Sequence, residues 1–328
     1  MDSAEIKKIK WQTALKRIVY DQKSDFIYAP HLAFIYNKAG DDLIKYVKSS
    51  LKSGNYNVGL PVTVEVQKSF RIKSPLLKRL GPNLSRPGSI LMPQDRILYQ
   101  ALSDEAVEII KNQTDNKKSF SHKISDVADD NLFVSTRKCW GGLQERLSEL
   151  SSRKTLKYIL KIDVSNFFGS INQHTLINTL RDAGYGAASA SVTEKILTIY
   201  TGDKSSRGIL QGLGPSDLLG NFYLTPVDQF LADKNIESAR YVDDIYIFIK
   251  TADDAERLLR ELVPFLRGYD LVLNEAKCAL MPKSALIAEE PDLERLFQNA
   301  VAEVSAQISD SDFDVDYGFQ SDWDDIDE

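Results

Sequence analysis

The sequence has only two cysteines, Cys139 and Cys278, and three histidines among its 328 residues. The two cysteines lie far apart and show none of the short spacings of zinc sites or redox-active dithiols. We interpret both as free thiols, as in a reducing cytoplasm. No apolar run approaches the roughly 20 residues of a membrane-spanning helix. The N-terminal segment MDSAEIKKIKWQ lacks the apolar stretch of a secretory signal. The sequence therefore predicts a cytoplasmic protein with no membrane partner.

Lys and Arg are absent from residues 308–328, which hold nine acidic residues. The net charge of −6 is therefore uneven, because residues 1–307 alone carry +3. A mildly basic body is compatible with a polyanionic partner such as a nucleic acid. The composition of residues 308–328 predicts a disordered acidic tail. Two roles stay open for it: a solubilising tail, or a mimic of nucleic acid that docks on a basic surface.

The remaining sequence predicts alternating helices and strands. Strands far apart in the chain, separated by amphipathic helices, favour an α+β fold with one sheet backed by helices. Asn172 is expected to cap a helix, because its side chain can accept from the first backbone N–H groups. The predicted helices are 4–20, 41–53, 95–111, 173–183, 191–200, 218–233 and 252–268, and the predicted strands are 62–66, 156–164, the two arms of 240–250, and 271–274.

Three aspartates carry the chemistry that this pattern predicts. Asp163 closes a strand, and Asp243 and Asp244 lie between the apolar runs of RYVDDIYIFIK. A lone Asp-Asp pair is usually a surface turn, but the apolar residues on both sides favour a buried hairpin. If the two strands are neighbours, three carboxylates converge at one edge of the sheet. Such a cluster suits two Mg²⁺ ions, which prefer carboxylates, phosphates and water and promote in-line phosphoryl transfer.

Five segments in this order resemble the motifs of reverse transcriptases, in the bacterial branch of group II intron, retron and abortive-infection enzymes. They are RPGSILMPQDRILYQAL (86–102), KIDVSNFFGSI (161–171), RGILQGLGPSDLLGNFYL (207–224), YVDD (241–244) and LVLNEAKC (271–278). The resemblance implies the fingers and palm of a right-hand polymerase. It divides the chain into an N-terminal helical segment (1–60), fingers (61–150), a palm (151–285) with a helical insertion at about 173–206, a C-terminal helix (286–307) and the acidic tail.

The resemblance also implies roles for single residues. Asp163, Asp243 and Asp244 would bind the two Mg²⁺ ions, and Lys277 would protonate the departing pyrophosphate, unless it is a plain surface lysine. Phe168 would exclude the 2′-hydroxyl of an incoming nucleotide, unless it only fills the core. The other implied contacts are Gln211 and Gly212 at the nucleotide and template, Arg86 and Arg96 on the triphosphate or template backbone, and Tyr241 at the primer end or in packing.

Two features depart from the family pattern. Leu210 precedes Gln211 where the family has proline, and Asp217 follows Ser216, where we expect it to cap the next helix. After residue 280 the chain offers one helix and the acidic tail, so the thumb is predicted to be reduced or absent. A partner protein, a structured RNA or a second copy of the chain would then hold the duplex.

The resemblance implies an RNA-directed DNA polymerase that uses dNTPs, an RNA template such as a cognate non-coding RNA, and a DNA primer or product. The absence of a maturase-like or endonuclease module favours a bacterial anti-phage system. Two alternatives stay open. One is template-independent or protein-primed DNA synthesis; the other is a catalytically silent RNA-binding scaffold. Phe168 argues against an RNA-dependent RNA polymerase.

Overall fold

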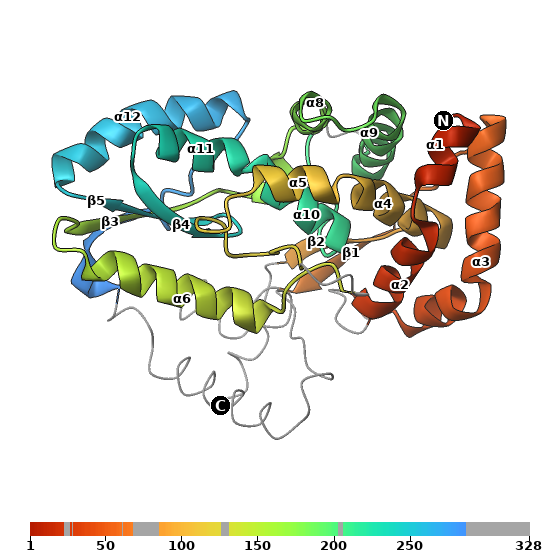
Figure 1. Ribbon diagram of the computed structural model, residues 1–328, viewed down its shortest axis with the longest axis horizontal. Coiled ribbons are helices and arrows are strands. Elements are labelled where there is room, and N and C mark those ends of the chain that lie inside the picture. Colours follow the sequence, from red (N-terminus) through yellow and green to blue (C-terminus); the bar gives the residue numbers. More distant parts are fainter. Residues whose placement is uncertain are drawn as a thin grey trace, which may run out of the picture.

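The computed structural model describes residues 1–22, 27, 29–60, 62–67, 85–125, 131–202 and 206–286. Three predictions lie outside these residues: the C-terminal helix, the acidic tail and the reduced thumb. The described elements form an elongated molecule, with the N-terminal helices at one end and a four-stranded sheet at the other (Figure 1). The α+β fold with fingers and palm predicted from the sequence is confirmed.

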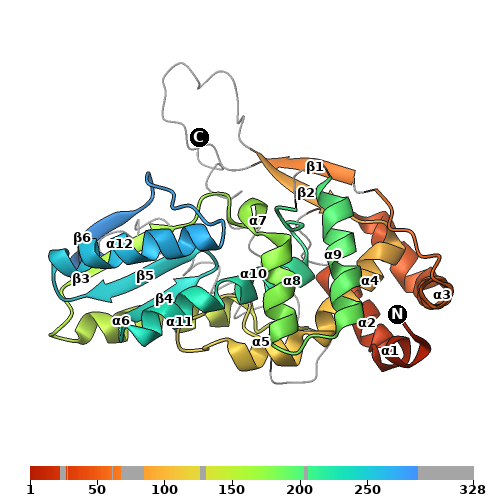
Figure 2. The same ribbon diagram turned by 90° about the horizontal axis from the view of Figure 1, so that it is seen from above.

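The N-terminal end is helical and carries one small hairpin. Strands β1 and β2 pair antiparallel, and both views place them apart from the four-stranded sheet (Figure 1 and Figure 2). Ala106 separates α4 from α5, so the single helix predicted for 95–111 is two. The predicted helix 4–20 is likewise two, and the one predicted for 41–53 begins earlier. The elements are α1 (Ser3–Lys8), α2 (Trp11–Asp21), α3 (Pro30–Ser53), β1 (Val62–Gln67), β2 (Ser85–Ile90), α4 (Pro93–Glu105) and α5 (Val107–Gln113).

Helix α4 forms the centre of this end. Its residues Asp95–Ser103 are all buried, because α2, α3, α9 and α10 all pack against it. A helix enclosed on every side is normally apolar all round, but this one also buries the carboxylate of Asp95. That carboxylate accepts hydrogen bonds from Tyr56 Oη (2.5 Å), Tyr200 Oη (2.6 Å) and the Gly59 N–H (2.8 Å). Asp95 thus joins α4 to α9 and to the segment before β1.

The other end is built on an antiparallel sheet with strand order β4-β5-β3-β6. Four of the six residues of β3 and four of the six of β5 are buried, since helices cover both faces of the sheet. Figure 1 shows α11 and α12 on one side of the sheet and α6 on the other. The strands are β3 (Tyr158–Asp163), β4 (Glu237–Tyr241), β5 (Asp244–Ile249) and β6 (Ala279–Pro282).

The helices of the second half follow the predicted order with two changes. Asn172 caps α8 as predicted, its Oδ1 accepting from the Thr175 N–H at 2.9 Å. The long helix predicted after the Gly-rich loop is two helices separated by Leu224, and the sequence predicted neither α6 nor the short helix α7. These helices are α6 (Thr136–Ser152), α7 (Phe167–Ser170), α8 (Gln173–Asp182), α9 (Ala187–Thr201), α10 (Gly214–Tyr223), α11 (Thr225–Asp233), α12 (Ala252–Gly268) and the 3₁₀ turn Lys283–Ala285.

The strand predicted for 271–274 is wrong. Within that segment only Leu273 forms a bridge, opposite Val164, and the fourth strand of the sheet is β6. Among the described helices, none is long and apolar enough to cross a membrane.

Candidate active site

Asp163 and Asp244 are direct cross-strand neighbours. They face each other in the antiparallel register of β3 and β5, and residues opposite each other in such a pair point to the same face of the sheet. Asp163 is only 4% exposed, whereas Asp244 is partly exposed. The Ile-rich alternation of β5 fixes this register, because a slip of one residue would turn its apolar set away from the core.

Asp243 lies in the two-residue turn between β4 and β5. Burial raises the pKa of its carboxyl to about 7, and the negative charges of Asp244 and then Asp163 act in the same direction. The positive charge of Lys277 acts against them. The structure therefore brings the three aspartates close enough to interact electrostatically, with Lys277 as a positive charge that partly offsets them.

Lys277 reaches the same place from the segment that follows α12. Backbone hydrogen bonds fasten this segment beside β3: the Ser165 N–H donates to the Val272 carbonyl and the Asn274 N–H to the Asp163 carbonyl, both at 2.8 Å. Lys277 Nζ then donates to Asp163 Oδ1 at 2.8 Å and stays half exposed. Lys277 is thus paired with one of the predicted metal ligands, and its role as a proton donor stays a prediction.

The donor chemistry of these residues fits Mg²⁺. Carboxylate oxygens are its preferred protein ligands, and Asp163, Asp243 and Asp244 supply them at one end of the sheet. In the described ranges, however, no three Asp, Glu, His or Cys side chains are grouped closely enough to hold one ion. Asp163 Oδ1, one of the oxygens that would bind a metal ion, instead accepts a hydrogen bond from the Lys277 ammonium.

Phe168 lies on α7, five residues after Asp163, and packs on α10. Its ring meets that of Phe167 edge to face, with centroids 5.2 Å apart. A Cβ added to Gly220 would come within 3.0 Å of Phe168 Cε1 and 3.4 Å of Phe167 Cε1. Glycine at position 220 thus leaves the space that the two rings occupy. Phe168 remains partly exposed, which a ring that only filled the core would not need to be.

The Gly-rich loop runs alongside the Phe168 segment. The Gly208 N–H donates to the Ile171 carbonyl at 2.8 Å, and the Ile209 N–H donates to the Phe168 carbonyl at 2.9 Å. Gln211 and Gly212 follow directly, both partly exposed. Gly212 has φ +79°, in the left-handed region that favours glycine. The loop is therefore bonded to the Phe168 segment just before Gln211 and Gly212.

The structure does not add the two predicted arginines, Arg86 and Arg96, to these site residues. Arg86 lies in β2, but its side chain falls outside the described part. Arg96 is 4% exposed and points inside the molecule, 3.7 Å from Asp21. The resemblance implied a contact of Arg96 with the triphosphate or template backbone, but Arg96 lies on the fully enclosed helix α4. We leave Arg96 out of the proposed site.

Asp217 does not cap a helix, and Tyr241 packs against another aromatic ring. The cap predicted for Asp217 is wrong: α10 begins after Leu213, without a side-chain cap, and Asp217 Oδ2 lies 3.8 Å from His122 Nε2. Tyr241 is buried and packs edge to face on Trp140 of α6, with ring centroids 5.2 Å apart. The packing interpretation of Tyr241 is therefore the one that its contacts favour.

Sequence reasoning missed one buried polar cluster beside the aspartates. Arg240, next to Tyr241 in β4, is completely buried and bonds to Asn221 and Asp228. A charged residue within the run ESARYVDD was the available signal, because a buried strand carries arginine only when a partner is buried with it.

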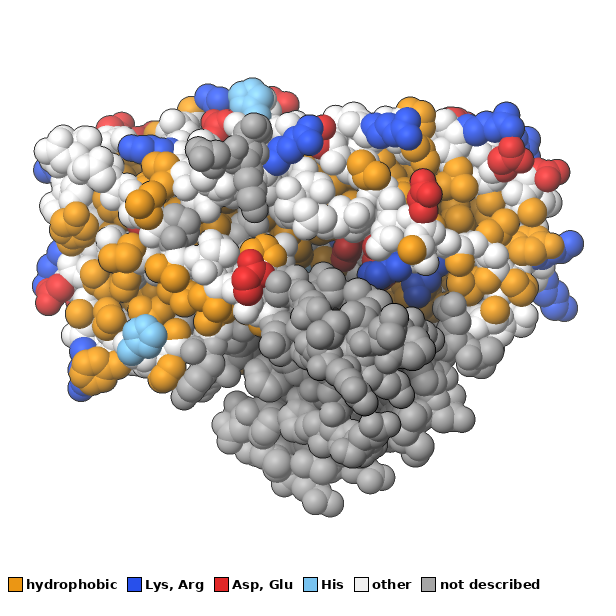
Figure 3. Space-filling model, turned by 180° about the vertical axis from the view of Figure 1, so that it is seen from behind, with side chains coloured by type: hydrophobic (Ala, Val, Ile, Leu, Met, Phe, Trp, Pro, Cys, Tyr) orange, Lys and Arg blue, Asp and Glu red, His pale blue; other side chains and the backbone are white. Residues whose placement is uncertain are grey.

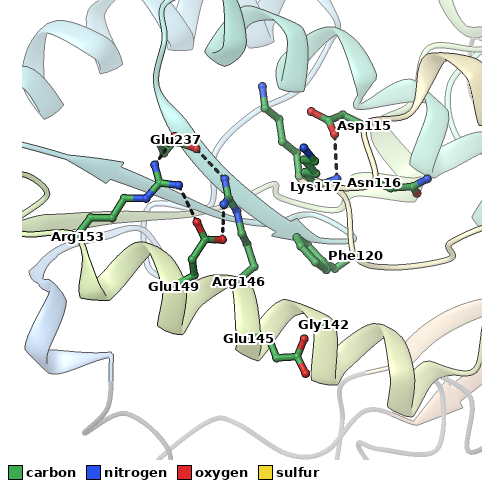
Figure 4. A pocket seen from close by; sticks show the side chains of 11 residues that line it. Asp115, Asn116, Lys117, Phe120, Gly142, Glu145, Arg146, Glu149, Arg153 and Glu237 are labelled. Atoms are coloured by element: carbon green, nitrogen blue, oxygen red, sulfur yellow. Dashed lines mark hydrogen bonds and ion pairs between the residues drawn. The ribbon is translucent and has the colours of Figure 1, made fainter.

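A separate hollow lies at the opposite end of β4. It has a volume of about 810 Å³ and is lined by α6, residues 115–120 and Glu237. Arg146 and Arg153 each bridge Glu149 and Glu237, which closes a ring of four ion pairs (Figure 4). None of the predicted site residues lines it. On the face shown in Figure 3, Lys and Arg are interspersed with hydrophobic and acidic side chains.

Known proteins match most of the chain, both by sequence family and by structure. The family model described as "Reverse transcriptase (RNA-dependent DNA polymerase)" matches residues 75–288, more than half of it. The solved apo telomerase from Candida Tropicalis is 13% identical over 76% of this chain and 49% of its own, with a TM-score of 0.43. Telomerase from Candida Tropicalis in complex with a TWJ fragment of telomeric RNA is 12% identical over 76% and 45%, with a TM-score of 0.44. This chain thus spans about half the length of those chains. Among curated proteins, none matches significantly.

Proposed function

This chain belongs to the reverse transcriptase family, and we propose that it is an RNA-directed DNA polymerase that adds dNTPs to a primer. The observation that carries the proposal is the register pair Asp163 and Asp244, with Asp243 in the adjoining turn. Carboxylates from two distant parts of the chain, the end of β3 and the turn between β4 and β5, come together at one end of the sheet. A fold that only binds RNA has no need to concentrate like charges there.

In this proposal Asp163, Asp243 and Asp244 hold two Mg²⁺ ions. When bound, Mg²⁺ supplies activation of the primer 3′ hydroxyl and stabilisation of the leaving pyrophosphate oxygen. Lys277 gives up its contact with Asp163 and donates a proton to the departing pyrophosphate. The ring of Phe168 lies under the sugar and leaves no room for a 2′-hydroxyl, while Gln211 and Gly212 face the nascent base pair.

The test is primer extension with purified protein. Oligo(dT) annealed to poly(rA), labelled dTTP and Mg²⁺ should give a DNA ladder. Asp243→Asn should abolish it, with a circular dichroism spectrum like that of wild type. The matched control is Asp182→Asn, an exposed acid at the end of α8. If wild type and Asp243→Asn give the same product, the polymerase assignment fails.

The finer placement extends the same proposal. The order of the five motifs supports the bacterial branch with group II intron, retron and abortive-infection enzymes, and with it a cytoplasmic role in anti-phage defence. A cognate RNA would be the template, and a partner protein or second copy would stand in for a reduced thumb. The proposed boundaries remain fingers at 61–150 and palm at 151–285, with the helical insertion α8–α9.

Sequencing the nucleic acid that co-purifies with the protein tests this placement. RNA of one defined sequence, with DNA complementary to it, would support templated synthesis. DNA that matches no bound RNA, or that is joined to the protein, would favour the template-independent or protein-primed alternative. Phage plating on cells with wild type and Asp243→Asn tests the defence role, because protection that survives the substitution would favour the silent scaffold.

A further inference from the structure

The turn that carries Asp243 contains a backbone conformation that its residue disfavours. Val242 has φ +52°, and a β-branched residue rarely adopts the left-handed region. It is the first of two residues between the paired Tyr241 and Asp244, the position that glycine occupies in a type II′ hairpin turn. Such a conformation costs on the order of 1–3 kcal/mol and persists only where neighbouring groups enforce it.

Both polar groups of the Val242 backbone are held by buried side chains. Its N–H donates to Ser121 Oγ at 2.8 Å, and its carbonyl accepts from Arg240 Nη1 at 3.4 Å. Ser121 belongs to a segment bound to β4 through the backbone of Arg240, which accepts from the Phe120 N–H at 3.0 Å and donates to the Lys118 carbonyl at 2.7 Å. The acceptor for Val242 is thus fixed from a part of the chain far from the turn.

The Arg240 side chain is held just as firmly. Its Nε lies 2.9 and 3.0 Å from the two carboxylate oxygens of Asp228 on α11. Its Nη1 donates to Asn221 Oδ1 at 2.7 Å and its Nη2 to the Asn221 carbonyl at 3.0 Å, on α10. Asn221 Nδ2 in turn donates to the Ser121 carbonyl at 3.3 Å. A buried guanidinium needs such saturation, because an unpaired one would cost several kcal/mol.

We propose that Ser121, Asn221, Asp228 and Arg240, together the turn clamp, are positioning residues that hold Val242 left-handed and so set the place of the Asp243 carboxylate. This rests on the proposed function and deepens it. Asn221 follows Gly220, the residue whose missing side chain makes room for Phe168. One helix, α10, therefore supports both the ring under the sugar and the turn with the metal ligand.

Ser121 offers the sharpest test, since its hydroxyl is small and bonds directly to the turn. Ser121→Ala leaves the Val242 N–H without that acceptor and changes packing little. Ser238→Ala is the matched control: Ser238 is equally buried in β4, and its hydroxyl makes no hydrogen bond to the described residues. Urea unfolding of each variant establishes that it is folded.

Val242→Gly separates positioning from general destabilisation. Glycine adopts positive φ without steric cost, so the turn should need the clamp less. We expect Ser121→Ala to lower kcat for dTTP addition on poly(rA)·oligo(dT) at least tenfold, with KM changed less than about threefold. In the Val242→Gly background, Ser121→Ala should lower kcat less than about threefold. Ser238→Ala should match wild type.

A second readout needs no catalysis. Calorimetric titration of the nucleic-acid-free protein with Mn²⁺ should show weaker binding to Ser121→Ala than to wild type or Ser238→Ala. In the double variant Ser121→Ala/Val242→Gly, the affinity for Mn²⁺ should return toward that of wild type. An unchanged kcat in Ser121→Ala, or a loss equally large in both backgrounds, overturns the inference. If wild type adds no nucleotide, the proposed function fails, and the Mn²⁺ titration alone decides the inference.

Discussion

The ammonium of Lys277 lies 2.8 Å from Asp163 Oδ1, although the two residues are 114 positions apart. The contact exists because residues 272–274 are bonded to the backbone at the end of β3. It leaves two properties of Lys277 to be separated by experiment, its positive charge beside Asp163 and its proposed donation of a proton.

Lys277→Arg separates these two properties. Arginine keeps the charge and can still pair with Asp163, but it does not release a proton at neutral pH. A general-acid role predicts that Lys277→Arg slows single-nucleotide addition about tenfold to hundredfold, close to the effect of Lys277→Met. Single-turnover rates between pH 6 and 9 check this. A rate for Lys277→Arg within twofold of wild type would show that the charge alone matters.

Asp243→Asn should stabilise the metal-free protein at high pH. A carboxyl whose pKa rises from 3.8 to about 7 on folding binds its proton more tightly in the native state. The wild type therefore loses stability as pH rises through that window, whereas asparagine does not titrate. With EDTA present, we expect a gain on the order of 2 kcal/mol at pH 8 and almost none at pH 4, measured by urea unfolding.

The control for this prediction is Asp182→Asn, which should show no such pH dependence. Adding Mg²⁺ should reverse the order at pH 8, since a ligand stabilises only the protein that binds it. A gain of equal size at both pH values would mean that the carboxylates do not interact as the structure indicates.

Phe168→Val should relax the choice of sugar. A smaller side chain leaves room for a 2′-hydroxyl, so the ratio of kcat/KM for dTTP over UTP should fall about tenfold or more. Phe167→Leu is the matched control, because Phe167 is buried against the same glycine and does not face solvent. It should lower stability without changing the ratio. An unchanged ratio in Phe168→Val would remove Phe168 from the nucleotide site.

Asp95→Asn should destabilise the helical end of the molecule. The buried carboxylate accepts three hydrogen bonds, and an amide replaces one acceptor oxygen with a donor that faces a donor. We expect a loss of about 2–3 kcal/mol in the free energy of unfolding. Tyr56→Phe, which removes one of the three donors, should cost less. Equal losses for the two variants would contradict this account.

The carboxylate site could be predicted because its signals are local. Apolar alternation on both sides of Asp243 and Asp244 predicts a buried hairpin, and a second apolar strand ends at Asp163. The pairing of those strands follows from the need to bury both. The roles of single residues stay predictions until the variants are measured.

What the sequence did not predict depends on contacts between distant segments. Strand β6 contains Pro282 and has a single buried residue, so it owes its strand conformation to pairing with β3. The burial of Arg96 follows from the helices around α4. Pro226 explains the break at Leu224, because proline has no N–H for a continuing helix. The turn clamp unites residues from four elements that no local pattern connects.

The place of β3 inside the sheet has a consequence for how the chain is made. Both of its neighbours, β5 and β6, are translated long afterwards, so an Ile- and Leu-rich strand leaves the ribosome with both edges open. Such edges invite pairing with other chains, and pairing over long sequence separations is slow. Nascent polypeptides stalled before residue 279 should therefore be the ones that chaperones retain, because β3 then still lacks one of its two partner strands.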